Sequence, residues 1–274
     1  QGMVTDEIEK LDAVAILTPP LNHAEIILEL LKRGIPIICE KPLVSSLEDA
    51  IAIKRESKVS RGFLSVTYNY SGYPMVRELR ERVQNGELGR IQKVHLEMPQ
   101  EGFSRVDPVT GQSTIPQSWR LKDGNIPTIC HDLGAHLHHL GYFITGKHVQ
   151  KTTGKFSSHS IYENVVDDIM MWLEYEDGMK GSFWMSKTAL GHRNGLRIRI
   201  YGTNGSAEWL QSRPEEMCIS GKDGSKTVLD RAARTMLCGE PRYNRYRPGH
   251  PSGFIEAFAT LYFDMADAVT SYSS

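Results

Sequence analysis

Short apolar runs alternate with a helical spacing of apolar side chains over the first part of the chain. Residues 12–17 (DAVAIL) and 35–39 (IPIIC) are continuous apolar runs, which are typical of strands covered on both faces. Between them, residues 23–34 place apolar side chains at positions 26, 27, 30 and 31 and end in a glycine, as a helix does. This strand, helix and strand predict a βαβ unit with neighbouring parallel strands.

The parallel pattern continues for one more helix and one more strand. Ser45 and Glu48 have the spacing of a capping box that opens a helix, and residues 62–70 (GFLSVTYNY) predict a strand. From about residue 73 the pattern changes. Residues 73–89 predict a helix with a charged outer face, and Asp177-Gly178 is a typical hairpin turn between strands. Further segments have strand character: 90–98, 167–178, 179–187 and 196–210.

These elements predict an α/β chain in two parts. Residues 1–68 are expected to form a parallel α/β piece. Residues 69–274 are expected to form an α+β domain with a large, mostly antiparallel open sheet. The segment from 100 to 127 is polar and rich in Gly, Pro and Ser, so we expect a long loop of functional importance there.

Composition narrows the classes of protein that fit this pattern. Of the 274 residues, 40% are hydrophobic and 24% are charged, as in an ordinary globular protein. The formal net charge of -1 and the lack of a basic block argue against a partner that is nucleic acid or a membrane surface. No apolar stretch of the sequence has the length of a bilayer span, and the first residues do not resemble a signal peptide.

Four cysteines stand at wide and irregular spacing, at positions 39, 130, 218 and 238. This pattern suits free thiols in a reducing compartment better than a disulfide framework or a zinc site. Together with the composition, it leads us to expect a cytoplasmic protein.

Two predicted strands end in residues that could bind a ligand. In open parallel sheets, ligands bind beyond the carboxyl ends of the strands. TPPLNH (18–23) follows the first strand and EKP (40–42) follows the second, where Pro42 prevents continuation of the strand and holds Lys41 at its tip. Taken alone, each motif also fits an ordinary exposed turn, so neither is specific by itself.

The segment CHDLGAHLHHLGYFITG (130–146) is the second candidate for chemistry. Asp132 and His136 are four residues apart, so on a helix they share one face, and a carboxylate beside an imidazole is a plausible general base with an orienting partner. Leu133, Leu137 and Leu140 would pack that helix against a core. Structural capping or core histidines and a metal site are the alternatives, the metal ligands being drawn from His131, Asp132, His136, His138 and His139. The spacing favours a helix face over a ligand cluster, and we predict no metal.

In combination and in this order, these motifs resemble the glucose–fructose oxidoreductase / inositol dehydrogenase (Gfo/Idh/MocA) family. Residues 11–43 look like the second half of its Rossmann domain, and the segments SWRL and HDLGAHLHHL resemble its Trp-Arg and Asp-x-Gly-x-His motifs. The resemblance implies a partial dinucleotide-binding (Rossmann) domain in residues 1–68 and a substrate-binding and oligomerisation domain in residues 69–274. It also implies NAD or NADP as cofactor and a sugar or polyol as substrate.

The resemblance implies a role for each matching residue. Lys41 would contact the reacting hydroxyl and the nicotinamide ribose, His136 would be the general acid/base, and Asp132 would hydrogen-bond the substrate. Residues matching cofactor-lining positions are Thr18, Pro19, Asn22, His23, Glu40, Lys41, Trp119 and Arg120. Residues that would line the sugar pocket are Tyr70, Asn194, Tyr246 and His250.

The sequence departs from the family pattern at both ends. A glycine-rich G-x-G-x-x-G turn and the acidic residue that follows it are absent, and the end after residue 274 falls short of the usual closing strand. We expect the chain to be a piece of a longer protein. We expect this piece by itself to bind dinucleotide weakly and to be inactive. The choice between NAD and NADP is not readable, because the deciding acidic residue belongs to the missing segment.

Two classes of function remain open at this point. The first is an NAD(P)-dependent oxidoreductase acting on a secondary alcohol, with an NAD-dependent glycoside hydrolase as a variant within the family. The second is a non-catalytic sugar-binding or regulatory relative. In either class, the open sheet face of strands such as DDIMMWLEY predicts a homodimer or homotetramer.

Overall fold

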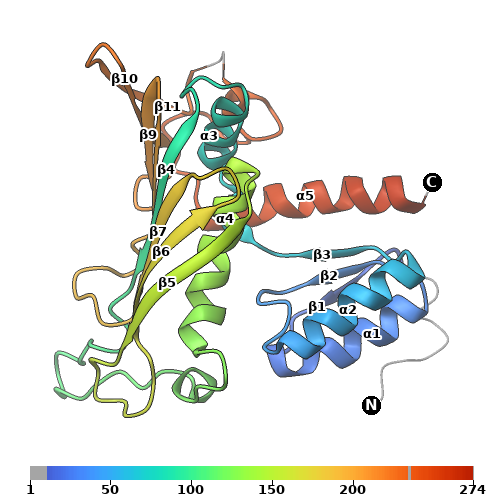
Figure 1. The fold of residues 1–274 in the computed structure, drawn as a ribbon. Coiled ribbons are helices and arrows are strands. Elements are labelled where there is room, and N and C mark those ends of the chain that lie inside the picture. Colours follow the sequence, from blue (N-terminus) through green and yellow to red (C-terminus); the bar gives the residue numbers. More distant parts are fainter. Residues whose placement is uncertain (1–10, 234–235, 274) are drawn as a thin grey trace. The chain divides into compact units, whose positions relative to one another are not determined.

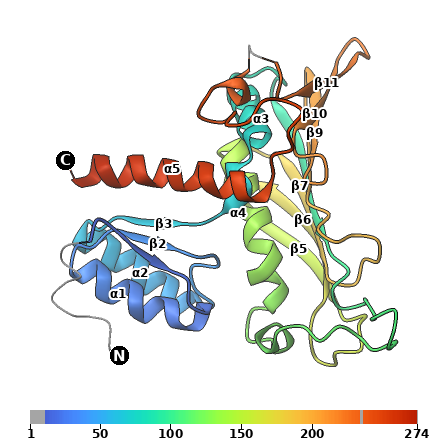
Figure 2. The ribbon, with the colours of Figure 1, turned by 180° about the vertical axis from the view of Figure 1, so that it is seen from behind.

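The computed structural model describes residues 11–233 and 236–273, which form two separate sheets (Figures 1 and 2). They group into two compact units. The first unit holds the described residues up to Asn69 together with those from Phe258 onward, and the second unit holds Tyr70–Ala257. The predicted fold class, a parallel α/β piece and a large mostly antiparallel sheet, is confirmed. The predicted assignment of residues 69–274 to one domain remains a prediction.

The first unit is built on three short parallel strands in the order β1-β2-β3. Its register aligns Ile16, Cys39 and Val66, so the carboxyl ends of the three strands meet at one edge of the sheet. Helices α1 and α2 lie on the same face of this sheet (Figure 1). The bounds are β1 (Val14–Ile16), α1 (His23–Lys32), β2 (Ile37–Cys39), α2 (Leu47–Ser60) and β3 (Leu64–Val66).

Local sequence explains where the two helices of this unit begin and end. α1 buries Ile27, Leu30 and Leu31 against the sheet, and Gly34, with a φ of 70°, reverses the chain after it. The predicted cap of α2 at Ser45 was wrong by one residue. Ser46 has extended backbone angles and its Oγ accepts a hydrogen bond from Asp49 N at 3.1 Å, because the serine pair and the acidic pair offer the same spacing twice.

Helix α5 (Phe254–Ser273) contributes its residues from Phe258 onward to the first unit. There the Tyr272 hydroxyl donates to Arg61 O at 3.0 Å, and the Tyr272 ring packs against Phe63. None of the helices in the described part of the chain combines the length and the apolar character needed to cross a membrane.

The second unit carries eight strands in the order β11-β10-β9-β8-β4-β7-β6-β5. β4 and β7 are parallel neighbours and the other pairs are antiparallel. The predicted hairpin at Asp177-Gly178 is confirmed between β6 and β7. The bounds are α3 (Pro74–Gln84), β4 (Ile91–Pro99), α4 (Ala135–Thr145), β5 (Val149–Ser157), β6 (Asp168–Tyr175), β7 (Lys180–Ser186), β8 (Arg197–Gly202), β9 (Gly205–Leu210), β10 (Glu216–Gly221) and β11 (Lys226–Asp230).

Helices α3 and α4 cover one face of the eight-stranded sheet, and no helix of the described part of this unit covers the other, which we term the helix-free face (Figures 1 and 2). Residues alternate accordingly along β6, where Ile169, Leu173 and Tyr175 are buried while Met170 and Trp172 are exposed. The core of the unit lies between the sheet and α3 and α4. The predicted apolar stripe of Leu133, Leu137 and Leu140 is buried within it.

Candidate active site

The carboxyl edge of the three-stranded sheet holds the residues predicted from TPPLNH and EKP. Thr18, Pro19 and Asn22 are exposed in the turn between β1 and α1. β2 ends at Cys39, so Glu40 and Lys41 stand beyond its tip, as the proline in EKP predicted. The two segments therefore lie at neighbouring strand ends of one sheet.

His23 links these two segments through contacts with their main-chain carbonyls. Its side chain is fully buried, with Nε2 2.7 Å from Thr18 O and Nδ1 3.1 Å from both Pro42 O and Leu43 O. Three main-chain carbonyls from two loops thus converge on one imidazole. The structure gives His23 the position of a support for both loops.

Glu40 links the tip of β2 to the tip of β3. Its Oε1 accepts a hydrogen bond from the Thr67 hydroxyl at 2.5 Å, and its Oε2 accepts from Lys41 N at 3.2 Å. Beside it, burial, with a smaller contribution from Glu40, raises the pKa of the Cys39 thiol to about 12. Cys39 therefore stays a neutral thiol and is not a nucleophile.

Asn69 adds a buried donor at the end of β3. Its Nδ2 is inaccessible to solvent and has no hydrogen-bond partner among the described residues. A buried amide N–H without an acceptor is costly, so this edge of the sheet suits a ligand that brings an acceptor oxygen. The strand-end residues present here therefore fit the polar groups of a dinucleotide.

Asp132 and His136 lie on one continuous helical segment of the second unit. Residues Cys130–Gly134 form a π-helical turn that leads directly into α4, and both side chains are about 95% buried. The prediction of a helix carrying both residues is confirmed, although its first turn is wider than an α-helix. Such wide turns occur often at functional sites.

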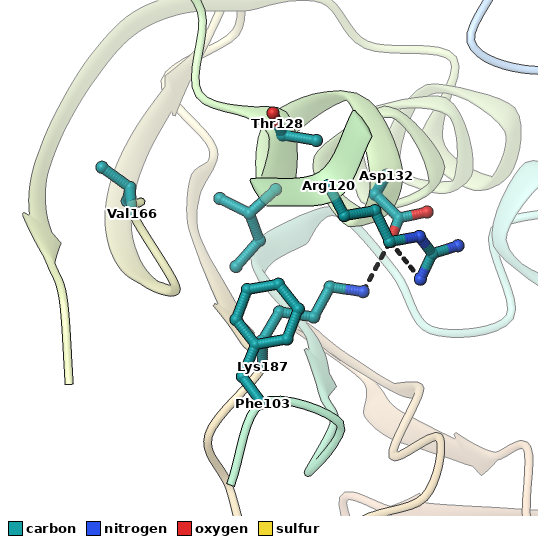
Figure 3. Close-up of a pocket in the computed structure, with 7 residues that line it drawn as sticks. Phe103, Arg120, Thr128, Asp132, Val166 and Lys187 are labelled. Carbon is teal, nitrogen blue, oxygen red and sulfur yellow. Dashed lines mark hydrogen bonds and ion pairs between the residues drawn. The ribbon is translucent and has the colours of Figure 1, made fainter. Parts of the chain in front are cut away.

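Two cations contact the Asp132 carboxylate. Lys187 Nζ lies 2.5 Å from Asp132 Oδ2, and Arg120 Nη1 lies 3.2 Å from the same oxygen (Figure 3). Arg120 also stacks on the Trp119 ring at 4.9 Å. The cavity at this point has a volume of about 10 Å³, which is the size of a single water molecule. It is a gap beside the carboxylate and not a substrate pocket.

Lys187 and Gln100 are site residues that the sequence analysis missed. Lys187 directly follows β7 and Gln100 directly follows β4, and these two strands are parallel neighbours. Gln100 Oε1 accepts from Lys187 Nζ at 2.7 Å. The signal was available, because the strand-like segment MKGSFWMSK ends in lysine as ICEK does.

Tyr70 and Asn194, predicted to line the sugar pocket, belong to the same cluster. The Tyr70 ring meets the His136 ring edge-on with centroids 4.6 Å apart, and its hydroxyl accepts from Asn194 Nδ2 at 2.9 Å. Burial raises the pKa of Tyr70 to about 12, with Tyr73 and Asp132 adding to the rise and the Asn194 hydrogen bond opposing it. Tyr70 is therefore a neutral phenol at physiological pH.

Tyr246 and His250 lie on a different segment of the second unit, and both are exposed. The buried Arg231 holds this segment through main-chain carbonyls, with Nη1 donating to Tyr246 O at 2.8 Å and Nη2 donating to His250 O at 2.9 Å. Glu215 Oε1 completes the clamp by accepting from Arg231 Nη2 at 2.8 Å. The two side chains are thus free to point to solvent while their backbone is fixed.

The remaining histidines around α4 are poor bases. Burial lowers the pKa of His131 and of His138, and it lowers the pKa of His139 to about 4. Among the described residues, no group of three or more His, Cys, Asp or Glu side chains is arranged to hold a metal ion.

Comparison with known proteins identifies the family. Residues 1–68 match the oxidoreductase family with an NAD-binding Rossmann fold, and residues 76–208 match the GFO/IDH/MocA C-terminal domain. Levoglucosan dehydrogenase of Pseudarthrobacter phenanthrenivorans is 26% identical over 265 residues, which cover 88% of this chain and 63% of that protein. The scyllo-inositol 2-dehydrogenase (NAD(+)) of Bacillus subtilis is 25% identical over 78% of this chain and 60% of its own length.

Solved structures give the same result. An oxidoreductase from Sinorhizobium meliloti is 33% identical with a TM-score of 0.83, covering 98% of this chain and 72% of that one. An inositol dehydrogenase homolog from Azotobacter vinelandii, complexed with NAD+, is 28% identical with a TM-score of 0.85, covering 96% of this chain and 69% of that one. The chain spans less than two thirds of the length of the two dehydrogenases named above. The chain belongs to the Gfo/Idh/MocA family of NAD-binding oxidoreductases.

Proposed function

We propose that the protein of which this chain forms at least part carries out NAD-dependent oxidation of a secondary alcohol of a sugar, polyol or sugar derivative. The observation that carries this proposal is one helical segment with two buried polar side chains: Asp132, which Arg120 and Lys187 contact, and His136, which packs against the neutral Tyr70. A strand tip that presents Lys41 in the first unit supports it. The relatives named as inositol and levoglucosan dehydrogenases support the substrate class.

Each of the three residues has a distinct task in this reaction. His136 takes the proton of the reacting hydroxyl on a ring nitrogen, which is general-base catalysis worth about 10²- to 10⁴-fold. The Lys41 ammonium stabilises the negative charge that develops on that oxygen, worth about 10²- to 10³-fold. Asp132 accepts a hydrogen bond from the substrate. The chemistry that NAD+ would supply when bound is acceptance of the hydride from the carbon, so that the alcohol would become a carbonyl.

The strand-end residues of the first unit would hold the cofactor. Thr18, Pro19, Asn22 and Glu40 present their polar and main-chain groups at the carboxyl edge, and Asn69 offers a donor there. His23 shapes the two loops from below. In the second unit, the stacked Trp119 and Arg120 would lie at the nicotinamide end.

The substrate-facing residues would be Tyr70 and Asn194, with Tyr246 and His250 at the rim. Tyr70 and Asn194 support this because they join the Asp132 and His136 cluster through hydrogen bonds and ring contact. Tyr246 and His250 support it more indirectly, through a segment whose main chain Arg231 holds in place. All four offer the hydrogen-bonding groups that a hydroxyl-rich ligand requires.

We also propose that the protein is a homodimer or homotetramer that pairs through the helix-free face of the large sheet. Met170, Trp172 and Tyr201 present apolar surface there, and Trp172 is 66% exposed. Exposed apolar side chains on a sheet face that no helix covers favour a subunit interface.

A Lys41→Ala variant, made in the longest natural form of the protein, tests the proposed function. We expect NADH formation with myo-inositol or levoglucosan as probes to fall by about 10²- to 10³-fold, because the developing charge loses its cation. Lys54→Ala, an exposed lysine of α2, is the matched control and should keep full activity. Equal turnover of wild type and Lys41→Ala would rule out this mechanism.

The same assay separates the other classes of function. A glycosidase that uses NAD transiently would cleave a glycoside without net NADH formation. A binding or regulatory protein would bind the sugar, measured by calorimetry, with no turnover in any variant. Either result would contradict the proposed dehydrogenase.

A further inference from the structure

A chain of hydrogen bonds runs from Lys187 to Tyr70 inside the second unit. Gln100 Oε1 accepts from Lys187 Nζ at 2.7 Å, and Gln100 Nε2 donates to Asn194 Oδ1 at 2.9 Å. Asn194 Nδ2 in turn donates to the Tyr70 hydroxyl oxygen at 2.9 Å. Four side chains from three regions of the sequence thus connect Asp132, at one end, to the ring that packs on His136, at the other.

The donor and acceptor at each step of this hydrogen-bond chain follow from its first member, Lys187. A lysine ammonium has three donors and no acceptor, so the group that faces it must be the Gln100 carbonyl oxygen. The amide nitrogen of Gln100 must then donate to the Asn194 oxygen, which turns the Asn194 amide nitrogen toward Tyr70. That nitrogen's second N–H donates to Gln211 Oε1 at 2.5 Å, which agrees with this orientation.

Lys187 has surroundings that favour its charged form. Its side chain is 4% exposed and that of Asp132 is 6% exposed, with 2.5 Å between the ammonium and the carboxylate. A buried ammonium without a partner is unfavourable, whereas a carboxylate in contact stabilises the charged form. Arg120, on the same oxygen, favours the anionic form of Asp132 as well.

The hydrogen-bond chain ends at the Tyr70 hydroxyl, which can still donate its own proton in a hydrogen bond. The Tyr70 oxygen already accepts from Asn194, and among the residues that the structure describes its own proton has no acceptor. Burial keeps the phenol neutral, so this proton stays available.

We propose that Lys187, acting through Gln100 and Asn194, fixes the Tyr70 hydroxyl as a hydrogen-bond donor to the substrate. Lys187, Gln100 and Asn194 are then positioning residues, and Tyr70 is the group that touches substrate. The site selects a substrate with an acceptor oxygen, a hydroxyl or a carbonyl, next to the reacting carbon. This inference rests on the proposed function for the identity of the substrate.

A near-isosteric substitution reverses the chain and so tests it. In Gln100→Glu, the new carboxylate has no N–H to give, so the Asn194 amide must turn its nitrogen toward Glu and its oxygen toward Tyr70. The Tyr70 hydroxyl then donates its hydrogen bond to the Asn194 oxygen and no longer to the substrate. Gln84→Glu, an exposed residue of α3, adds the same charge away from the site and is the matched control.

A double-mutant cycle on kcat/KM gives the decisive result. We expect Tyr70→Phe to lower kcat/KM by about 2- to 10-fold in the wild type and in Gln84→Glu, as for loss of one neutral hydrogen bond. In the Gln100→Glu background the same change should have no effect, and Lys187→Arg, which also only donates, should keep the wild-type effect. An equal loss from Tyr70→Phe in every background would overturn the proposal.

A measurement without turnover separates this inference from the proposed function. In the purified chain labelled with 13Cζ-tyrosine, the Tyr70 resonance is assigned by its loss in Tyr70→Phe. We expect that resonance to shift in Gln100→Glu and to stay in place in Gln84→Glu and Lys187→Arg, provided that each variant keeps the wild-type Tm. A resonance that does not respond to Gln100→Glu would refute the directed chain, even in an active dehydrogenase.

Discussion

Two buried polar side chains, Asp132 and His136, are the residues on which the proposed chemistry depends most. Burial normally disfavours charged groups, and here two cations offset that cost for Asp132. His136 instead packs edge-on against the neutral ring of Tyr70. We therefore propose that the carboxylate acts as a hydrogen-bond acceptor and that the imidazole exchanges a proton with the substrate.

Replacement of the base gives the first prediction. His136→Asn should lower kcat for polyol oxidation by about 10²- to 10⁴-fold, because no side chain then takes the hydroxyl proton. Binding of NADH, followed by fluorescence titration, should be unchanged. His138→Asn, which changes another histidine of the same helix, is the control and should keep its kcat. A kcat for His136→Asn within a few-fold of wild type would argue against a general base at this position.

Of the residues around Asp132 and His136, the sequence predicted some and missed others, and the reason is physical. Asp132 and His136 stand in one short motif with helical spacing, so a single sequence suffices to place them on one helix. The role of Lys41 remains a prediction. Lys187 and Gln100 come from the ends of two strands that are parallel neighbours in space yet far apart along the chain. Their convergence depends on strand order, which no local pattern contains.

Among the elements, α4 with its preceding π-helical turn has the largest effect on the site. The i,i+4 spacing predicted a helix with Asp132 and His136 on one face, and the helix is present. The wider first turn was not predictable, since it leaves no mark in apolar periodicity. The offset of the α2 cap from Ser45 to Ser46 has a similar origin, because two overlapping pairs satisfied the same spacing rule.

The histidines of α4 predict a loss of stability in acid. Burial, and to a lesser extent His138, lowers the pKa of His139 from 6.5 to about 4, so between these values the unfolded chain binds a proton that the native state does not. Stability from this group is therefore complete above pH 6.5 and is lost as the pH falls toward 4.

His139→Gln should make the free energy of unfolding less dependent on pH over this interval, as measured by urea titration. The lowered pKa of His131 and of His138 has the same sign, so part of the slope should remain. A slope that does not change in His139→Gln would mean that His139 is protonated to the same degree in both states.

Strand β8 supplies a prediction about packing. A Cβ added at Gly202 would lie 2.0 Å from Leu88 O, a main-chain atom that cannot swing away. Gly202→Ala should therefore lower the free energy of unfolding by about 1–3 kcal/mol or more, as overpacking does. Gly102→Ala, where an added Cβ meets nothing within 4 Å, is the control and should be neutral or slightly stabilising. Equal stabilities in urea would show that the Leu88 segment yields freely.

At the scale of the whole molecule, the sequence predicted both kinds of sheet. Continuous apolar runs separated by a helix gave the parallel piece, and alternating segments with a hairpin turn gave the antiparallel one. The grouping of α5 residues with the N-terminal unit could not be predicted in this way. It depends on contacts, such as Tyr272 with Arg61, between segments at opposite ends of the chain.

The helix-free face predicts association of identical chains. Light scattering at micromolar concentration should give the mass of two or four chains. Trp172→Glu should shift the population toward the single chain, because it puts a charge beside the exposed apolar side chain of Met170 on this face. Ile161→Glu, an exposed apolar residue in the loop between β5 and β6, should leave the mass unchanged. A wild-type protein with the mass of one chain would contradict the proposed oligomer.

Transfer of a hydride to NAD+ is the central claim, and it can be followed with deuterium. The natural full-length protein is incubated with NAD+ and myo-inositol or levoglucosan deuterated at the ring carbons that bear hydroxyl groups, and the nucleotide is analysed by mass spectrometry. We expect deuterated NADH to accumulate with wild type and to form about 10²- to 10³-fold more slowly with Lys41→Ala. If calorimetry shows that either substrate binds but the nucleotide stays undeuterated, hydride transfer to NAD+ is contradicted.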